Sequence, residues 1–301
     1  MINGLSRALD IANGRRILLR GEGRAFCAGG DIKAQAQAIR NNDMAGPTEY
    51  FRDEYGFNAK LFHHASPYVS YLNGIVMGGG YGVSGHGSHL VACESTQFAM
   101  PEVKIGFFPD VGAVYHLARV QNELGTYMAL TGNTVNAADM LHMGLAHGYV
   151  PAASFDALAE GLCTGAPDDV IASLHVAPGV DGLLRAHEDV IARCFAFDDA
   201  LAIVDALKTD GSDFAVSTAA DIEARSPTSV RVALSHIRAA RNEGFDTVIA
   251  RDFSLSQRFL GVPDFPEGVR AAVIDKDRNP RWNPRSLADF TQAQAGLYLN
   301  S

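Results

Sequence analysis

Apolar residues in the first half of the chain occur in short runs between glycine-rich or polar stretches. Ile17–Arg20 and Tyr68–Leu72 are such runs, and each has turn residues beside it, so both are predicted to be buried strands. Helical spacing of the apolar positions predicts a helix tail over residues 1–14 and helices over residues 32–40 and 48–63. Strands that alternate with helices at this spacing indicate an α/β fold with parallel strands.

The same alternation continues up to Pro151. Short strands are predicted at Leu90–Cys93 and Thr96–Ala99. Helices are predicted over residues 80–87, 111–118, 123–130 and 137–141, and glycines follow the last two.

After Pro151 the pattern becomes largely helical. Apolar residues recur every three or four positions in residues 153–163, 181–195, 199–208, 212–224 and 227–242. Ser226 followed by Pro227 is a strong helix start, because serine caps a helix and proline fits its first turn. We therefore predict an α/β core over residues 1–151 and a helical region over residues 152–301.

Composition and charge narrow the class of protein. The chain has 301 residues, of which 47% are hydrophobic and 20% charged, as in an ordinary globular protein. Its formal net charge of -9 argues against nucleic acid as a partner. No apolar run is long enough to span a membrane, and the first residues resemble neither a signal peptide nor a transit peptide. We expect a cytoplasmic protein with no membrane partner.

The cysteines and histidines give no metal or disulfide pattern. Cys27, Cys93, Cys163 and Cys194 are widely spaced, which predicts free thiols in a reducing compartment. The ten histidines are scattered and form no His-Glu-x-x-His motif. We expect no bound metal.

Two glycine-rich stretches are candidates for anion binding. Gly78, Gly79 and Gly80 follow a predicted strand, and a helix that starts there would point unpaired N–H groups outward. A second stretch, residues 21–31, lacks the dinucleotide-binding pattern because Phe26 stands where the third glycine is required. The alternative is that these glycines only allow tight turns.

Two acidic residues follow the glycine triplet, and each comes directly after a proline. Glu102 and Asp110 have apolar neighbours such as Phe98, Phe107 and Phe108, and burial would raise the pKa of a carboxylate there towards neutrality. Fixed N–H donors together with two carboxylates indicate an active site. The alternative is that each acid caps a helix or lies on the surface, and Asp110 is well placed to cap the helix predicted after it.

Several motifs in register along the chain resemble the enoyl-CoA hydratase/isomerase (crotonase) superfamily, and within it the 3-hydroxyisobutyryl-CoA hydrolases. The core motifs are Arg24–Asp31, Asn73–Gly80, Phe98–Glu102 and Ile105–Gly112. Further similar segments are Phe51–Tyr55, Ala129–Gly132, Ser226–Ser229, Glu267–Ala271 and Ile274–Trp282. The resemblance implies a spiral core of short ββα units with a helical C-terminal part. The β-hairpin with which the family begins is expected to be missing here.

The resemblance also assigns roles to individual residues. It implies that the backbone N–H groups of Gly30 and Gly79 form an oxyanion hole for a thioester carbonyl. Glu102 would attack that carbonyl or activate a water against it, and Asp110 would orient the water or substrate and assist proton transfer. Glu54 would accept a hydrogen bond from a substrate 3-hydroxyl, unless it is a solvated helix acid beside Asp53.

The resemblance also concerns two further substrate-binding positions and one position at which this chain differs from the hydratases. Ala28 and Asp31 would lie among the substrate-binding residues. Hydratases of the superfamily carry a second catalytic glutamate at the position of Gly82, so glycine there disfavours hydration and favours hydrolysis.

The resulting hypothesis is hydrolysis of a short 3-hydroxyacyl-CoA thioester, first of all 3-hydroxyisobutyryl-CoA, as in valine breakdown. Coenzyme A enters as part of the substrate, and no other cofactor is expected. Relatives suggest a homo-oligomer, a trimer or hexamer. Two alternatives remain open, which are an enoyl-CoA hydratase or isomerase and a non-catalytic acyl-CoA binder.

Overall fold

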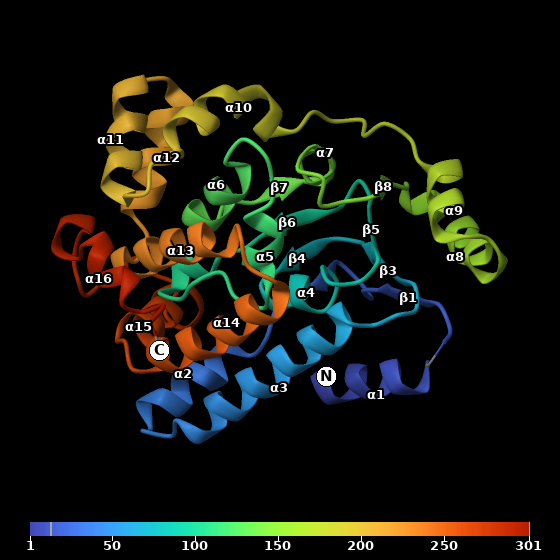
Figure 1. Ribbon diagram of the computed structural model, residues 1–301, viewed down its shortest axis with the longest axis horizontal. Helices are drawn as coiled ribbons and strands as arrows, with labels where there is room; N and C mark the ends of the chain where they lie inside the picture. The colour runs from blue at the N-terminus through green and yellow to red at the C-terminus, as the bar shows by residue number, and fades with distance from the viewer. Residues whose placement is uncertain (13, 301) are drawn as a thin grey trace. The chain divides into compact units, whose positions relative to one another are not determined.

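The computed structural model (Figure 1) describes residues 1–12 and 14–300. The chain forms two compact units. Unit 1 comprises Met1–Gly29, Asp53–Ala99 and Thr134–Ala186, and unit 2 comprises Gly30–Arg52, Met100–Asn133 and His187–Ser301. Both units are therefore assembled from three separate segments. The predicted division at residue 151 follows the order of the chain instead, and it stays a prediction.

Unit 1 contains two four-stranded sheets of short strands (Figure 1). The first sheet is entirely parallel, with the order β1 (Ile17–Arg20), β3 (Tyr68–Leu72), β5 (His89–Ala92) and β8 (Gly148–Tyr149). The second has the order β2 (Ala25–Cys27), β4 (Ile75–Met77), β6 (Gln97–Ala99) and β7 (Val135–Asn136), of which only the β6–β7 pair is antiparallel. The predicted parallel α/β organisation is confirmed.

Alternating side chains of β3 fill two different cores in unit 1. Val69 and Tyr71 pack with residues of the hairpin formed by the 3-10 turn η2 (Ala152–Ser154), α8 (Phe155–Thr164) and α9 (Pro167–Leu174). Tyr68 packs with Leu9 of α1 (Ile2–Ile11) and with Phe57 of α3 (Ala45–Phe62). Because successive side chains of a strand point to opposite faces, one buried strand supports helices on both sides of the sheet.

The remaining helices of unit 1 are short or partial. They are α4 (Gly79–Gly82), α7 (Ala137–His142), the C-terminal part of α3, and the first turn of α10 (Leu183–Cys194). The predicted helix over residues 80–87 is wrong in extent, because α4 ends at Gly82 and tight turns follow. The turns arise where Ser84 and Gly85 donate their N–H groups back to the carbonyl of Tyr81.

Unit 2 is helical. Its elements before residue 187 are α2 (Ile32–Arg40), the N-terminal part of α3, the 3-10 turn η1 (Glu102–Ile105), α5 (Ala113–Leu117) and α6 (Leu124–Thr131). Those after it are the rest of α10, α11 (Ala200–Asp210), α12 (Asp213–Glu223), α13 (Pro227–Ala240), α14 (Phe245–Leu260), α15 (Asp264–Val269), η3 (Arg270–Ile274), η4 (Leu287–Asp289) and α16 (Gln292–Gly296). None of the helices in the described part of the chain is long and apolar enough to cross a membrane.

Helix α13 is the most buried long helix of unit 2, and it starts as predicted. The hydroxyl of Ser226 accepts the Ser229 N–H, and Pro227 occupies the first turn. Eleven of its fourteen residues are buried. A helix enclosed in this way cannot leave its polar side chains in water, so each of them must find a partner inside the protein.

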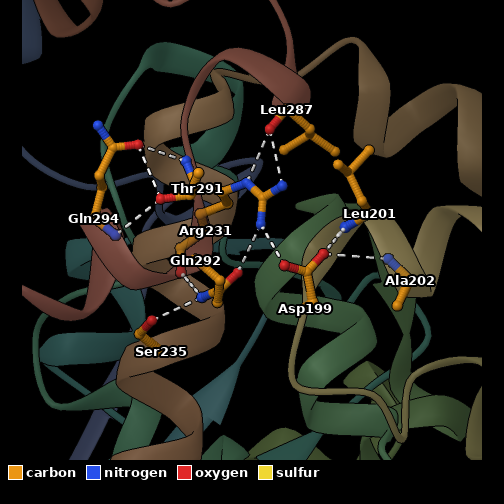
Figure 2. Close-up of polar contacts among 9 residues, drawn as sticks. All are labelled: Asp199, Leu201, Ala202, Arg231, Ser235, Leu287, Thr291, Gln292 and Gln294. Carbon is orange, nitrogen blue, oxygen red and sulfur yellow. Dashed lines mark hydrogen bonds and ion pairs between the residues drawn. The ribbon is translucent and has the colours of Figure 1, made fainter.

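Arg231 is the largest polar side chain on α13, and it is 2% exposed. Figure 2 shows its guanidinium between the Leu287 carbonyl, which accepts at 2.8 and 3.1 Å, and the Asp199 carboxylate at 2.9 Å. Asp199 also caps α11 by accepting the Leu201 and Ala202 N–H groups. The side chain of Gln292 donates to the Arg231 carbonyl at 2.8 Å. One buried cation thus joins α13 to the start of α11 and to the C-terminal segment.

We expect Arg231→Met to lower the free energy of unfolding by about 3–5 kcal/mol, because it leaves a buried carbonyl and a carboxylate without their donor. Urea denaturation followed by circular dichroism measures this loss. Lys208→Met is the matched control, since Lys208 and Glu223 form an exposed ion pair at 2.7 Å. The control should cost about 1 kcal/mol or less. Equal losses in the two variants would contradict a special role for Arg231.

Candidate active site

The glycine triplet lies in unit 1 at the junction of β4 and α4. Gly78 has φ 51° and ends the strand, and α4 begins at Gly79. A Cβ atom on Gly80 would lie 2.0 Å from the carbonyl oxygen of Cys27 in the neighbouring strand β2, so only glycine fits there. The close approach of the two backbones brings the start of α4 beside the loop that follows Cys27.

Both predicted oxyanion donors have an N–H group that is not used by the fold. Among the residues that the structure describes, neither the Gly79 N–H nor the Gly30 N–H donates a hydrogen bond. Gly79 is half-buried in unit 1, and Gly30 is exposed in unit 2. A glycine that serves only a tight turn gives no reason for a free donor, whereas an anion-binding position requires one.

Glu54 lies on α3 within unit 1 and is only 4% exposed, while its neighbour Asp53 is exposed. The interpretation of Glu54 as a solvated helix acid is therefore wrong. One turn later, the fully buried Asn58 donates to the carbonyl of Gly82 at 2.9 Å and so holds the last residue of α4. Its Oδ1 atom has no partner among the described residues. Helix α3 thus carries two buried polar side chains, of which that of Asn58 binds the end of α4.

Cys27 belongs to the same part of unit 1, and its surroundings disfavour the reactive thiolate form. Burial raises the pKa of its thiol, and the nearby Glu54 carboxylate raises it further, against a hydrogen bond from the Gly29 backbone. A thiol with a raised pKa stays protonated near neutral pH and reacts poorly.

Glu102 is the first residue of η1 in unit 2, and it is 6% exposed. The position of η1 is set by backbone contact with α15. A Cβ atom on Gly106, which has φ 72°, would lie 2.2 Å from the Asp264 carbonyl oxygen. A Cβ atom on Gly268 would lie 2.3 Å from the Ile105 carbonyl carbon. The turn that carries Glu102 is therefore held against α15 with no side chain between them.

Asp110 follows η1 on a segment that aromatic rings hold in place. Phe107 stacks on Phe51 with the ring centroids 5.4 Å apart, and it also contacts Phe259 and Phe265. Phe108 packs on Phe107 at 4.7 Å and is fully buried. Such ring contacts fix the backbone just before Asp110, whose side chain is 6% exposed.

The segment continues through two left-handed residues. Val111 has φ 53° and Gly112 has φ 73°. A β-branched residue in this region is a true outlier that costs about 1–2 kcal/mol. The N-cap of α5 is Gly112, so Asp110 does not cap the predicted helix as its alternative role required. The backbone N–H of Gly112 instead donates at 2.7 Å to the buried carboxylate of Asp252 on α14.

Asp252 and its partner His236 were not found from the sequence. Nε2 of His236, on α13, lies 2.6 Å from Oδ1 of Asp252, and both side chains are fully buried. A signal was present in α13, because His236 occupies the apolar stripe of Val232, Ala233 and Ile237. A histidine on an apolar face requires a buried partner, although the sequence does not say which one.

The remaining predicted positions have structural explanations of their own. Asp31 is exposed and caps α2 by accepting the Ala34 N–H at 3.0 Å. Ala28 is exposed in the loop after β2. Their assignment as substrate-binding residues stays a prediction. Ala28, Glu54 and Gly79 belong to unit 1, whereas Gly30, Asp31, Glu102 and Asp110 belong to unit 2.

Histidines gather near β5 and β8 without forming a metal site. The Nδ1 atoms of His147 and His175 accept the N–H groups of Leu90 and Tyr149 at 3.0 and 2.9 Å. Their ring lone pairs are therefore already used. Within residues 1–12 and 14–300, no group of three or more His, Cys, Asp or Glu side chains is placed to hold a metal ion.

The whole chain is similar to known proteins. The family model described as enoyl-CoA hydratase/isomerase matches residues 1–299. The mitochondrial 3-hydroxyisobutyryl-CoA hydrolase of Bos taurus is 38% identical over 296 residues, which cover 95% of this chain and 76% of the relative. The probable 3-hydroxyisobutyryl-CoA hydrolase 3 of Arabidopsis thaliana is 37% identical over 297 residues, with 94% and 79% covered.

Solved structures share the fold. The crystal structure of a carnitinyl-CoA dehydratase from Mycobacterium thermoresistibile matches with a TM-score of 0.92 and 34% identity, covering 99% of this chain and 88% of the other. An enoyl-CoA hydratase from Rhodobacter sphaeroides 2.4.1 matches with a TM-score of 0.89 and 30% identity, covering 99% and 89%. Proteins named as hydrolases, dehydratases and hydratases therefore share this architecture.

The contact between η1 and α15 gives a prediction in which two effects have opposite signs. Alanine normally stabilises the interior of a helix relative to glycine by about 0.5–1 kcal/mol. In Gly268→Ala, however, the new methyl group would displace the Ile105 backbone, and overpacking of this kind costs about 1–3 kcal/mol. We therefore expect this variant to have a lower melting temperature than the unaltered protein.

Gly56→Ala is the control for this prediction. Gly56 also lies inside a helix, α3, but nothing lies within 4 Å of its added Cβ atom. The control should raise the melting temperature slightly, as measured by differential scanning calorimetry. A stabilised Gly268→Ala variant would contradict the proposed contact.

Proposed function

Since the chain belongs to the enoyl-CoA hydratase/isomerase family, we propose that it hydrolyses a short 3-hydroxyacyl-CoA thioester, first of all 3-hydroxyisobutyryl-CoA. The products are the free 3-hydroxy acid and coenzyme A. The α/β crotonase-like fold expected from the sequence is confirmed by the solved relatives. Relatives named 3-hydroxyisobutyryl-CoA hydrolase are 36–38% identical over about the whole chain, which supports the reaction.

The observation that carries the proposal is the set of three buried carboxylates at Glu54, Glu102 and Asp110. Carboxylates are rarely buried in folded proteins, and those that are buried cluster at functional sites. Each of the three acids matches a position that the sequence resemblance assigned to the chemistry or to the substrate. They are therefore the groups that we assign to thioester hydrolysis.

In the proposed reaction the thioester carbonyl accepts hydrogen bonds from the Gly30 and Gly79 N–H groups. Glu102 either attacks the carbonyl carbon or removes a proton from the attacking water. The negative charge that develops on the carbonyl oxygen is stabilised by the two donors, and one such donor contributes about 3–4 kcal/mol in other enzymes. The C–S bond then breaks, and the thiolate of coenzyme A takes up a proton. If Glu102 was the nucleophile, water then hydrolyses the anhydride between Glu102 and the acyl group, which releases the free acid and restores the Glu102 carboxylate. Asp110 orients the water and assists these proton transfers.

Glu54 is proposed to select the acyl group. A carboxylate that accepts a hydrogen bond from a 3-hydroxyl group gains this interaction only with a hydroxyacyl thioester, so the site would favour hydroxyacyl over plain acyl thioesters. No resident metal or redox cofactor is part of the proposal.

Hydration of an enoyl-CoA is the second candidate, and the names of the solved relatives favour it. Gly82 argues against it, because that position supplies no carboxylate and its carbonyl is occupied by Asn58. A non-catalytic acyl-CoA binder is the third candidate, and it gives no reason for burying Glu102 and Asp110.

We further propose a cytoplasmic enzyme that assembles as a homo-oligomer, a trimer or hexamer. The four cysteines are free, which fits a reducing compartment. Several relatives are named mitochondrial, so fractionation of the native cell is the relevant test of location. Light scattering at several protein concentrations tests the oligomeric state.

The first functional prediction concerns the substrate. Coenzyme A release, followed with a thiol reagent, should be faster from 3-hydroxyisobutyryl-CoA and 3-hydroxypropionyl-CoA than from crotonyl-CoA, because only the hydroxyacyl groups can donate a hydrogen bond to Glu54. Loss of the crotonyl absorbance without thiol release would assign the protein to the hydratases. Binding of all three without turnover would support the acyl-CoA binder.

The second functional prediction concerns the acids. Glu102→Gln and Asp110→Asn should each lower kcat for coenzyme A release by about 10²–10⁴-fold, since an amide neither removes a proton nor attacks the carbonyl. Glu160→Gln, an exposed glutamate on α8, is a control that should retain the unaltered rate. Unchanged rates in both site variants would remove the catalytic assignment.

A further inference from the structure

We propose that Asp252, oriented by His236, is a positioning residue that holds the Asp110 loop in its active geometry. This proposal rests on the proposed function of Asp110. It adds two residues of the helical region, which the sequence resemblance did not assign, to the working parts of the site.

The backbone of the loop after Asp110 has an unusual conformation. Val111 and Gly112 are both left-handed, and Val111 is a buried β-branched residue for which this conformation is unfavourable. Such a conformation persists only where the surroundings over-determine it, and residues of this kind cluster at functional sites. Asp110 directly precedes the pair, so its direction depends on their conformation.

A hydrogen bond to a distant helix holds this conformation. The Gly112 N–H donates at 2.7 Å to Oδ2 of Asp252, a residue 140 positions further along the chain. A carboxylate accepts more strongly than a neutral group does. The loop is therefore tied to a helix that lies far away in the sequence.

His236 orients the Asp252 carboxylate. Oδ1 of Asp252 lies 2.6 Å from Nε2 of His236, while Nδ1 of His236 has no partner among the described residues. A buried nitrogen without a proton costs less than a buried N–H donor without an acceptor. The ring therefore carries its proton on Nε2 and donates it to Asp252, so the carboxylate receives one donor on each oxygen.

His236 also packs against the loop before Asp110. His236 contacts the ring of Phe108 with the centroids 6.0 Å apart, and Phe108 precedes Asp110 by two residues. His236 therefore contacts the loop before Asp110, at Phe108. It also orients the Asp252 carboxylate, which binds the loop after Asp110, at Gly112. Arg231, which lies earlier on α13, fixes this helix to the C-terminal segment (Figure 2).

Stability alone does not explain this arrangement. Burial raises the pKa of Asp252 in spite of its two hydrogen bonds, which shows that the fold disfavours the charge. Buried ionic groups are often replaced by apolar ones at no loss of stability. A buried acid that binds a strained loop beside a catalytic carboxylate has a clearer purpose in holding that carboxylate still.

The test compares Asp252→Leu with Asp252→Asn. Leucine removes the acceptor for the Gly112 N–H, whereas asparagine keeps one oxygen for it but donates its amide to His236 only if the ring proton moves from Nε2 to Nδ1. We expect Asp252→Leu to lower kcat about 100-fold with little change in KM, because a displacement of about 1 Å has such an effect. Asp252→Asn should restore most of kcat. Amide hydrogen exchange should be faster at Gly112 in the leucine variant and close to the unaltered rate in the asparagine variant.

Asp139→Leu is the matched control. Asp139 is a buried carboxylate of unit 1 that accepts the Leu184 N–H at 2.8 Å, and it has no role in the proposed chemistry. Its loss should lower the melting temperature without changing kcat or the exchange of Gly112. If Asp252→Leu does not fold, Asp252→Ser, which is too short to reach both partners, takes its place with the same expectations.

The outcomes separate this proposal from the proposed function. An Asp252→Leu variant with unaltered kcat and unaltered Gly112 exchange overturns the positioning role. Equal losses in the leucine and asparagine variants also overturn it, because asparagine keeps the acceptor. If the unaltered protein releases no coenzyme A, the proposed function fails, and Gly112 exchange alone then decides whether Asp252 holds the loop.

Discussion

Backbone segments that touch with no side chain between them are the constraint on which the candidate site depends. In unit 1, the start of α4 lies against β2 at Gly80, where no Cβ atom fits. In unit 2, η1 lies against α15 at Gly106 and Gly268 for the same reason. Contact between backbones leaves less freedom than contact between side chains, which change rotamer. The proposed donor Gly79 and the proposed catalytic acid Glu102 are both carried on such segments.

A second level of organisation consists of buried polar groups that bind backbone rather than one another. Arg231 donates to the Leu287 carbonyl, Asp252 accepts the Gly112 N–H, and Asn58 donates to the Gly82 carbonyl. Burying each of these side chains costs desolvation free energy. In each case the hydrogen bond to backbone fixes the position of a loop or a helix end. Two of the three involve α13 or its neighbour α14. Helices α13 and α14 thus position the backbone of other segments of unit 2.

The sequence predicts those parts of the fold that depend on local pattern. Tyr68–Leu72 is a continuous apolar run between turn residues, and Ser226-Pro227 starts a helix by its own chemistry, so both were predicted correctly. The strands β2 and β4 have three residues each and lie among glycines, so no periodicity reveals them. They exist because of parallel pairing with each other across the chain.

The candidate site divides in the same way. The motif positions of Glu54, Glu102 and Asp110 could be named from sequence, because the resemblance covers them. The alternative that Asp110 caps the following helix is wrong, because Gly112 is the N-cap of α5. Val111, which lies between the two residues, has a left-handed backbone. No local rule predicts a left-handed valine. Its conformation depends on Asp252, which lies 140 residues from Gly112, so it follows from tertiary structure alone.

The choice between hydrolysis and hydration depends on few atoms, because relatives named for both reactions share the fold. Hydration adds a proton and a hydroxyl group to neighbouring carbons, so it is helped by two acids that act on one water. Hydrolysis needs a nucleophile at the carbonyl carbon and donors for its oxygen, which one acid and two N–H groups supply. Gly82 provides no second acid on α4, and its carbonyl is held by Asn58. The proposed hydrogen bond from a 3-hydroxyl group to the buried Glu54 likewise favours a substrate that already carries a hydroxyl group.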